Sequence, residues 1–411
     1  MLPEGWKLKS LKQIGECISG LTYSPDNITD KENGRLLVLR SSNIKNGSIV
    51  LEDNVYVDSC VDDTKLTRSK DILICVRNGS KSLIGKSAII TNPDAIGQAH
   101  GAFMSVFRSE SNEYIFQLFQ TSMFYRQVSA DLGATINSIN TNNLLKYKFP
   151  IPPLPEQKKI AQILSTWDNA ISATERLLEN SQRRKKALMQ QLLTGKKRLP
   201  GFEGEWGKYK LNDIIDEFVN GYAFSASEYK PSGIPIITMG NIGLDGAFNE
   251  RLQKQNFWED RSELEKFKVY KGDLLIAMTD VTPDKNLIGR MVIVNVNNVF
   301  YLNQRVGLVK LKEKVSKLFI KYLSNEPDWR KYSKAVSASG VQANLSTKDI
   351  KNGTVRIPSY DEQLAIANVL TTADQEIDAL QKRLGHLKQE KKALMQQLLT
   401  GKRRVQVDAA A

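Results

Sequence analysis

The sequence is poor in the residues that build metal sites and catalytic triads. Only two histidines, His100 and His386, occur in 411 residues, and the second lies in a strongly helical stretch. The three cysteines, Cys17, Cys60 and Cys75, lack the paired spacing of zinc ligands. We expect these thiols to be reduced and buried, since isolated cysteines behave as small hydrophobic residues. Zinc chemistry and a histidine-based triad therefore have little support.

Long apolar runs and an export signal are also missing from the chain. No stretch approaches the roughly 20 apolar residues that span a bilayer, and the first residues show no signal-peptide pattern. With 41% hydrophobic and 25% charged residues, the composition is typical of a soluble protein with two or three domains. We expect a cytoplasmic protein, with residues 405–411 as a tail added by cloning.

Catalytic motifs are incomplete wherever the sequence resembles them. Residues 79–87, GSKSLIGKS, resemble a P-loop, but five residues separate the glycines where phosphate binding needs four. The proline pair of 151–154, IPPL, lacks the flanking residues with which amino-methyltransferases hold a base. No glycine-rich turn for S-adenosylmethionine and no nuclease carboxylate pattern stands out. We predict a non-catalytic chain without a cofactor, and interpret 79–86 as a nucleic-acid contact loop or a solvated turn.

The most informative feature of the chain is a repeat. Residues 185–198, KKALMQQLLTGKKR, return as KKALMQQLLTGKRR at 391–404, a lag of 206 residues. At the same lag, Glu156-Gln157 matches Glu362-Gln363. The sequence is therefore a tandem duplication.

Each copy of the repeated segment is predicted to form one long helix of roughly 40 residues, about 60 Å in length. Apolar residues recur in a 4,3 spacing that places them on one narrow stripe. Such a stripe favours pairing of the two helices, although packing of each helix on its own domain stays open. Only about ten residues join the first helix to the next domain, so the pair should be antiparallel. The predicted seam comprises Ile160, Leu164, Trp167, Ile171, Leu178, Leu188, Leu192, Ile366, Leu370, Ile377, Leu380, Leu384, Leu387, Leu394 and Leu398.

The segments outside the helices are two diverged copies of one domain. Ser42-Asn43-Ile44 matches Gly240-Asn241-Ile242, and the apolar run at 71–74 matches 273–276. Short β-rich runs such as 36–39, 234–239, 291–296 and 306–311 precede helix-like runs at 112–128 and 317–333. The expected fold is α+β, with two globular α/β domains separated by a long antiparallel two-helix coiled coil and pseudo-twofold symmetry. The expected bounds are 1–150 and 199–356 for the domains, and 151–198 and 357–404 for the helices.

Charge is strongly positive, at +13, which favours a polyanionic partner. The helical segments 156–198 and 362–404 contribute +6 and +3 of this excess, mainly in their last turns. A basic run on a helix is commonly a solvated face. Nucleic-acid binding therefore has to be argued from the domains.

Taken over its full length, the chain resembles the specificity subunit of a type I restriction-modification enzyme. The resemblance rests on the KKALMQQLLTGK helix ends, on the Pro-Glu-Gln and Asp-Glu-Gln openings at 155–157 and 361–363, and on the domain starts LPEGW and LPGFEGEW. It implies two target-recognition domains that each read half of a bipartite DNA site, and helices that set the spacer and dock two modification subunits. The second copy, IPSYDEQ, lacks the proline pair, so we expect a looser joint there.

The same resemblance implies which chemistry belongs to other chains. Modification subunits would hold S-adenosylmethionine and methylate adenine at N6, and restriction subunits would use ATP and magnesium. The alternative is a non-catalytic coiled-coil adaptor between proteins, which predicts no salt-dependent affinity for DNA.

Candidate DNA-binding residues are the polar side chains predicted near strand ends and loops. Asn and Gln pair with adenine, and Arg and Lys with guanine, in the major groove. The candidates in the first domain are Arg40, Asn43, Arg77, Asn78, Ser80, Lys81, Lys86, Gln98, His100, Asn137 and Asn140. Those in the second are Asn241, Thr279, Asp280, Lys285, Arg290, Gln304, Arg305, Gln342 and Asn344.

Overall fold

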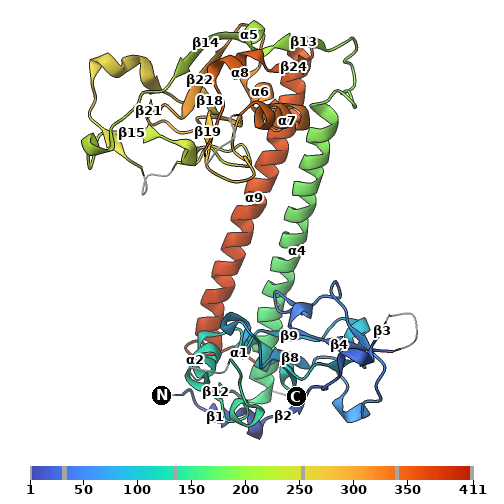
Figure 1. The fold of residues 1–411 in the computed structure, drawn as a ribbon. Helices are drawn as coiled ribbons and strands as arrows, with labels where there is room; N and C mark the ends of the chain where they lie inside the picture. The colour runs from blue at the N-terminus through green and yellow to red at the C-terminus, as the bar shows by residue number, and fades with distance from the viewer. Residues whose placement is uncertain (1, 30–34, 133–136, 251–254, 338–341, 408–411) are drawn as a thin grey trace. The chain divides into compact units, whose positions relative to one another are not determined.

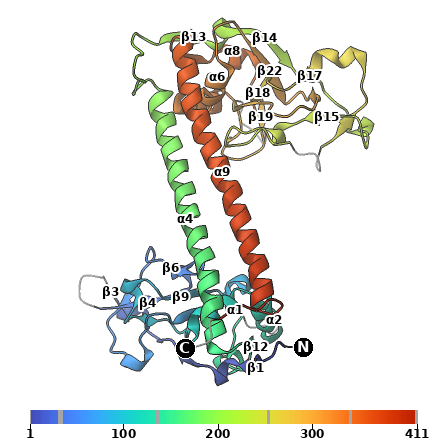
Figure 2. The ribbon, with the colours of Figure 1, turned by 180° about the vertical axis from the view of Figure 1, so that it is seen from behind.

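The computed structural model describes residues 2–29, 35–132, 137–250, 255–337 and 342–407 (Figures 1 and 2). It divides into two compact units, one formed by 1–175 with 382–411 and the other by 176–381. Each unit holds one globular domain and a part of both long helices. The last four residues of the expected cloning tail, 408–411, lie outside the described residues.

The main sheet of the first domain has four antiparallel strands in the order β2-β11-β8-β9. Strand β8 is buried at every position, which explains its uninterrupted apolar sequence ILIC. Strand β8 pairs with β11 and β9, and its two faces enter two apolar clusters, one with Ile72 and Ile74 and one with Leu73 and Cys75. The bounds are β2 Glu16–Ser19, β11 Met104–Arg108, β8 Ile72–Cys75 and β9 Ser87–Ile89.

A second sheet of the first domain follows the order β10-β4-β7-β3 and contains one parallel pair, β10 with β4. Its strands are β10 Ala99–His100, β4 Leu36–Leu39, β7 Tyr56–Val57 and β3 Ile28–Thr29. Two shorter antiparallel pairs are β1 Lys7–Ser10 with β12 Lys148–Ile151, and β5 Ile44–Lys45 with β6 Ser48–Ile49.

The second domain repeats this plan. Its main sheet has the order β14-β22-β18-β20, and its second sheet, β16-β15-β21-β17, again contains a parallel pair, β15 with β21. The second sheets differ in the place of one strand. In the second domain β17 pairs with β21, a member of the parallel pair, whereas in the first domain β3 pairs with β7, which lies outside the parallel pair. The bounds are β14 Ile215–Asn220, β22 Val306–Leu311, β18 Leu274–Ala277, β20 Met291–Ile293, β16 Phe257–Trp258, β15 Ile234–Ile237, β21 Phe300–Leu302 and β17 Lys268–Val269. Shorter pairs are β13 Gly207–Lys210 with β24 Thr354–Ile357, and β19 Thr279–Asp280 with β23 Ala343–Asn344.

Two short helices stand in each domain where the sequence predicts one. The first run breaks because Thr121 caps a new helix, with its hydroxyl accepting a hydrogen bond from the Phe124 amide at 3.4 Å. The second breaks at Glu326, whose carboxylate accepts from the Asp328 amide at 2.9 Å next to Pro327. The short helices are α1 Asn112–Phe119, α2 Ser122–Asp131, α3 Thr141–Leu144, α5 Leu211–Ile214, α6 Lys317–Leu323, α7 Pro327–Val336 and α8 Thr347–Asn352.

The two long helices are α4, Leu154–Leu192, and α9, Tyr360–Leu398, of 39 residues each. Pro155 lies inside the first turn of α4, where a missing amide proton costs nothing. Both helices end before a glycine with a left-handed backbone, Gly195 at φ +69° and Gly401 at φ +73°, as the sequence predicts.

The long helices pack together in an antiparallel pair, and every residue of the predicted seam is half-buried or buried. Their ends also enter the domain cores, so both packing modes of the sequence analysis occur together. Ile160 and Leu164 of α4 join Leu398 of α9 in the core of the first domain. In the second unit, Leu192 of α4 joins Ile366 of α9.

Two ion pairs between the repeated segments 154–198 and 360–404 occur twice, once in each unit. Glu156 pairs with Arg404 in the first unit, and Glu362 pairs with Arg198 in the second, at 2.5 Å from Oε1 to Nε. Each residue lies 206 positions from its counterpart, so the duplication keeps the pairing. Lys391 with Asp168, and Lys185 with Asp374, repeat in the same way.

Each globular domain also contacts the aspartate of an ion pair between the long helices, Asp168 in the first unit and Asp374 in the second. The Gln117 Nε2 group donates to Asp168 Oδ2 at 2.9 Å, and the Tyr322 hydroxyl donates to Asp374 Oδ2 at 2.7 Å. Each aspartate therefore joins the facing long helix to a short helix of the domain in its unit. Burial and this contact with Asp374 raise the pKa of Tyr322.

One hydrogen bond at the joint between domain and helix occurs in both copies, and the looser second joint stays a prediction. Gln157 Nε2 donates to the Pro152 carbonyl at 2.8 Å, and Gln363 Nε2 donates to the Pro358 carbonyl at 3.0 Å. The glutamine that both copies share makes this bond, so loss of the second proline does not remove it.

Replacing Asp168 with Asn should destabilise the first unit by about 1–3 kcal/mol, the range for a buried polar group that loses a partner, because the Lys391 ammonium is buried and would lose its carboxylate. The Lys391 Nζ lies 2.6 Å from Asp168 Oδ1, and the lysine side chain is 11% exposed. Urea unfolding measures this loss in the free energy of unfolding.

The double variant Asp168→Asn with Lys391→Met should recover most of the lost unfolding free energy, since no buried charge remains. Glu390→Gln, at an exposed neighbour on α9, should stay within about 0.5 kcal/mol of the parent. An equal loss of unfolding free energy in the single and the double variant would contradict the ion pair between Asp168 and Lys391.

The thiols differ in exposure, which corrects the expectation that all three are buried. Cys75 is buried and Cys17 half-buried, but Cys60 is exposed. Burial raises the pKa of Cys17 to about 12, so this thiol stays protonated at neutral pH.

Among the described residues, no helix combines the length and the apolar composition that membrane crossing requires.

Candidate nucleic-acid interface

Loops that are far apart in the sequence meet beside the strand ends of the first domain. Asn78 Nδ2 donates to the Ser41 hydroxyl at 3.2 Å, and Asn137 Nδ2 donates to the Gly79 carbonyl at 3.0 Å. The Val76 amide donates to the Phe103 carbonyl at 3.0 Å. The loops at 40–43, 77–83, 101–103 and 137–140 therefore form one continuous surface, which we call the first-domain loop surface.

Six candidate residues of this surface are exposed or half-buried, and hydrogen bonds hold its loops in place. Arg77 is exposed, with its guanidinium carbon 5.1 Å from the centre of the Phe103 ring. Arg40 is half-buried and pairs with the Asp53 carboxylate at 2.9 Å. The remaining four are exposed or half-buried: Asn78, Ser80, Lys81 and Asn137. Lys86 is half-buried on the hairpin after β8, and Asn140 is an exposed cap of α3.

Three candidates of the first domain have structural roles instead. Asn43 is fully buried, with Oδ1 accepting from the Arg40 amide and Nδ2 donating to the Val50 carbonyl. Gln98 Oε1 accepts from the Leu37 amide at 2.9 Å. His100 is 1% exposed, and burial lowers its pKa, so the imidazole is neutral at pH 7. These side chains hold loops and strands in place, with Asn43 and His100 buried and Gln98 half-buried.

In the second domain, four candidates lie on two adjoining segments. The Met278 amide donates to the Arg305 carbonyl at 3.0 Å, and the next residue, Thr279, pairs with Asn344 across β19 and β23. Gln342 Nε2 donates to Asn344 Oδ1 at 3.0 Å. Gln304, Arg305 and Asn344 are exposed and Gln342 is half-buried, so these four can reach a ligand.

The remaining candidates of the second domain hold loops together. Asn241 is 1% exposed and donates to the Asn249 carbonyl, and the buried Thr279 hydroxyl contacts Met239. Burial raises the pKa of Asp280, but hydrogen bonds from the amides of residues 282, 287 and 288 lower it overall. Lys285 Nζ donates to the Ser337 carbonyl, and Arg290 Nε donates to the Asn286 carbonyl at 2.6 Å. The sequence could not separate these residues from exposed ones, because short loops have no periodic burial pattern.

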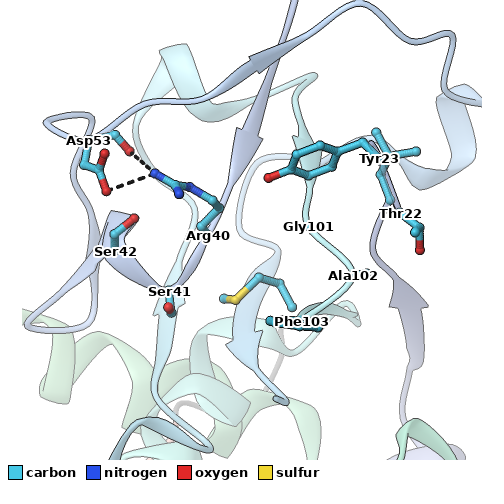
Figure 3. Close-up of a pocket in the computed structure, with 11 residues that line it drawn as sticks. Thr22, Tyr23, Arg40, Ser41, Ser42, Asp53, Gly101, Ala102 and Phe103 are labelled. Carbon is cyan, nitrogen blue, oxygen red and sulfur yellow. Dashed lines mark hydrogen bonds and ion pairs between the residues drawn. The ribbon is translucent and has the colours of Figure 1, made fainter. Parts of the chain in front are cut away.

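A cavity of about 520 Å³ opens on the first-domain loop surface (Figure 3). The Tyr23 ring extends toward Arg40 across it, and Phe103 lies below Tyr23 in this view. Sequence reasoning missed Tyr23 and Phe103, since an aromatic residue beside a strand usually belongs to a core. The residue Phe103 is instead 55% exposed. Its position in a turn, directly after Gly101-Ala102, is the signal that was available.

The two domains share a backbone frame at this place and differ in side chains. A Cβ atom on Gly20 would lie 2.0 Å from the Gly101 carbonyl oxygen, and one on Gly221 would lie 2.1 Å from that of Asn303. Only glycine permits this close approach in both copies. The carbonyl that accepts from Val76 belongs to Phe103, and the one that accepts from Met278 belongs to Arg305. A constant frame that presents different side chains is the arrangement expected of two readers with different targets.

Within the described ranges, no group of three or more His, Cys, Asp or Glu side chains is placed to hold a metal ion. Residues 81–83 of the P-loop-like stretch form a single 3-10 turn, and Ser80 N donates to Asn78 Oδ1 at 3.0 Å. Arg77 and Lys81 give the first-domain loop surface positive charge, and Phe103 adds an exposed apolar side chain.

Comparisons with known proteins agree on one family. A family model described as the type I restriction modification DNA specificity domain matches residues 3–180 and 203–389. The chain is 26% identical over 402 residues to the type I restriction enzyme EcoKI specificity subunit of Escherichia coli K12, covering 94% of this chain and 85% of that protein. It is 27% identical over 419 residues to the StySPI specificity subunit of Salmonella potsdam, covering 97% and 88%.

Solved structures share the fold. The crystal structure of a type I restriction-modification S subunit from M. genitalium matches with a TM-score of 0.62 at 15% identity, over 96% of each chain. A chain from a structural study of complex assembly in a type I system matches with a TM-score of 0.54 at 19% identity, over 98% of this chain and 99% of the other. At these identities the likeness concerns the fold alone.

Proposed function

We propose, since this chain belongs to the family of type I restriction-modification DNA specificity subunits, that its two domains each read one half of a bipartite, asymmetric DNA site. The observation that carries this proposal is the pair of loop surfaces. One backbone frame presents Arg40, Arg77 and Phe103 in the first domain and Arg305 in the second, so the two half-sites differ in sequence. Each surface offers donors and a cation of the kind that reads base edges.

Partner subunits supply the chemistry in this proposal. The near-identical segments 185–198 and 391–404 present the same exposed residues twice, which suits two copies of one modification subunit. We assign S-adenosylmethionine and adenine-N6 methylation to those subunits, and ATP and magnesium to restriction subunits. The chain itself contributes recognition and no catalytic centre, and it works in the cytoplasm, where the DNA is.

Deleting the gene should abolish adenine methylation at one bipartite motif across the genome. Sequencing that detects modified bases, with and without the gene, measures this. Restoring the intact gene should restore the motif, and restoring a copy with Arg77→Ala and Arg305→Ala should weaken or relax it, since each bidentate contact contributes about 1–3 kcal/mol of discrimination. An unchanged set of methylated motifs in the deletion strain would contradict the proposal.

A further inference from the structure

The cavity beside Phe103 has two kinds of wall. Its apolar side comes from the rings of Tyr23 and Phe103 with Leu21 and Met104, and its polar side from Arg40 and Ser41. The Ser41 hydroxyl oxygen accepts from Asn78, so its proton is free to be donated. The cavity therefore combines hydrogen-bond donors with an exposed apolar face.

The Phe103 ring is held in its exposed position. The Val76 and Arg77 amides both donate to its carbonyl, at 3.0 and 3.1 Å, and the Met104 amide donates to the Gly101 carbonyl at 2.8 Å. The Arg77 guanidinium lies over the ring. An apolar ring kept in solvent by this many bonds costs free energy in the unbound protein, which a ligand that covers it would recover.

The chemistry of base edges selects the ligand. In the major groove, adenine and cytosine present amino donors, which the cavity's hydroxyl groups could accept because its carboxylate, Asp53, is paired with Arg40. Neither base carries a methyl group that would cover the Phe103 ring. Guanine presents two acceptors and no apolar group. Thymine presents one acceptor, O4, beside a 5-methyl group, which matches donors placed next to an exposed ring.

We propose that the cavity beside Phe103 reads a thymine of the first half-site through its 5-methyl group. This reading rests on the proposed function and adds the identity of one base to it. The second domain has Arg305 where the first has Phe103, so the methyl contact belongs to the first half-site.

Replacing thymine with deoxyuridine tests the contact, since it removes the methyl group and leaves the pairing edge intact. The assembled modification complex is titrated, at one fixed salt concentration, with duplexes that carry a single uridine at each thymine of the site in turn. One position of the first half-site should weaken binding by about fourfold, the factor expected for one buried methyl group.

Phe103→Ala should bind the thymine and uridine duplexes equally at that position. Phe103→Leu should keep part of the ratio of thymine-duplex to uridine-duplex affinity, because leucine is also apolar. Arg305→Ala, at the equivalent turn of the second domain, should leave the ratio unchanged. Equal binding of all uridine duplexes by the parent complex would overturn the thymine assignment while leaving bipartite recognition intact. A ratio that survives in Phe103→Ala would overturn the role of the ring. Absence of any sequence-specific binding would overturn both this inference and the proposed function.

Discussion

Exchanging residues 206–350 for the equivalent domain of a relative should change the second half-site alone. The loop surfaces of the two domains are built from separate stretches of chain, and the first domain keeps its own core of buried strands such as β8. Specific protein–DNA contacts contribute roughly a thousandfold or more over non-specific binding, so methylation at the original composite site should fall by about that factor. Sequencing of modified adenines reads both half-sites at once.

The donor for this exchange has to preserve the bonds between domain and helix. Trp206 is buried against the helix ends, the Ser316 amide donates to Gln363 Oε1 at 2.9 Å, and Tyr322 donates to Asp374. A donor with a tryptophan and a tyrosine at these places keeps the joint. Exchange of 1–150 is the reciprocal control and should change the first half-site alone. If either exchange altered both half-sites together, the modular interpretation would be wrong.

Inserting one heptad in both long helices should lengthen the preferred DNA spacer, since we propose that the paired helices set it. The structure identifies a directly opposed position, because the Ser181 hydroxyl donates to Glu376 Oε1 at 2.7 Å. Seven residues placed after Ser181 and after Gln375 continue the apolar seam and add about 10 Å. At about 3.4 Å per base pair, the spacer should grow by up to about three base pairs.

Rotation around the DNA complicates this result. Three base pairs turn one half-site by roughly 100°, given about 10.5 base pairs per turn, and a stiff helix pair resists following it. Longer spacing or lost binding are therefore the two expected outcomes across a series of spacer lengths. Insertion in α4 alone is the control and should disrupt the seam. An insert in both helices that leaves full affinity for the original spacer would show that the helices do not set the distance.

The long helices show how far a repeat carries prediction. Seam residues such as Leu164 and Leu370 could be placed from spacing alone, because a 3.5-residue period fixes which residues share a face. The antiparallel direction followed from a short connection. Strands such as β4 and β22 were also found at their predicted positions, since short apolar runs between turn residues are local signals.

The tertiary structure alone decided which polar residues are free to bind. Asn43 and Asn78 look alike in the sequence, yet the first is buried in a turn and the second lies on the loop surface. The same holds for Asp280, whose hydrogen bonds come from amides up to eight residues away. The sequence by itself determined the duplication and the family, which depend on comparing residues along the chain, and the long helices, which depend on local periodicity. The grouping of Tyr23, Arg40 and Phe103 around one cavity depends on strand pairing between distant segments, and that pairing is set only when the domain folds.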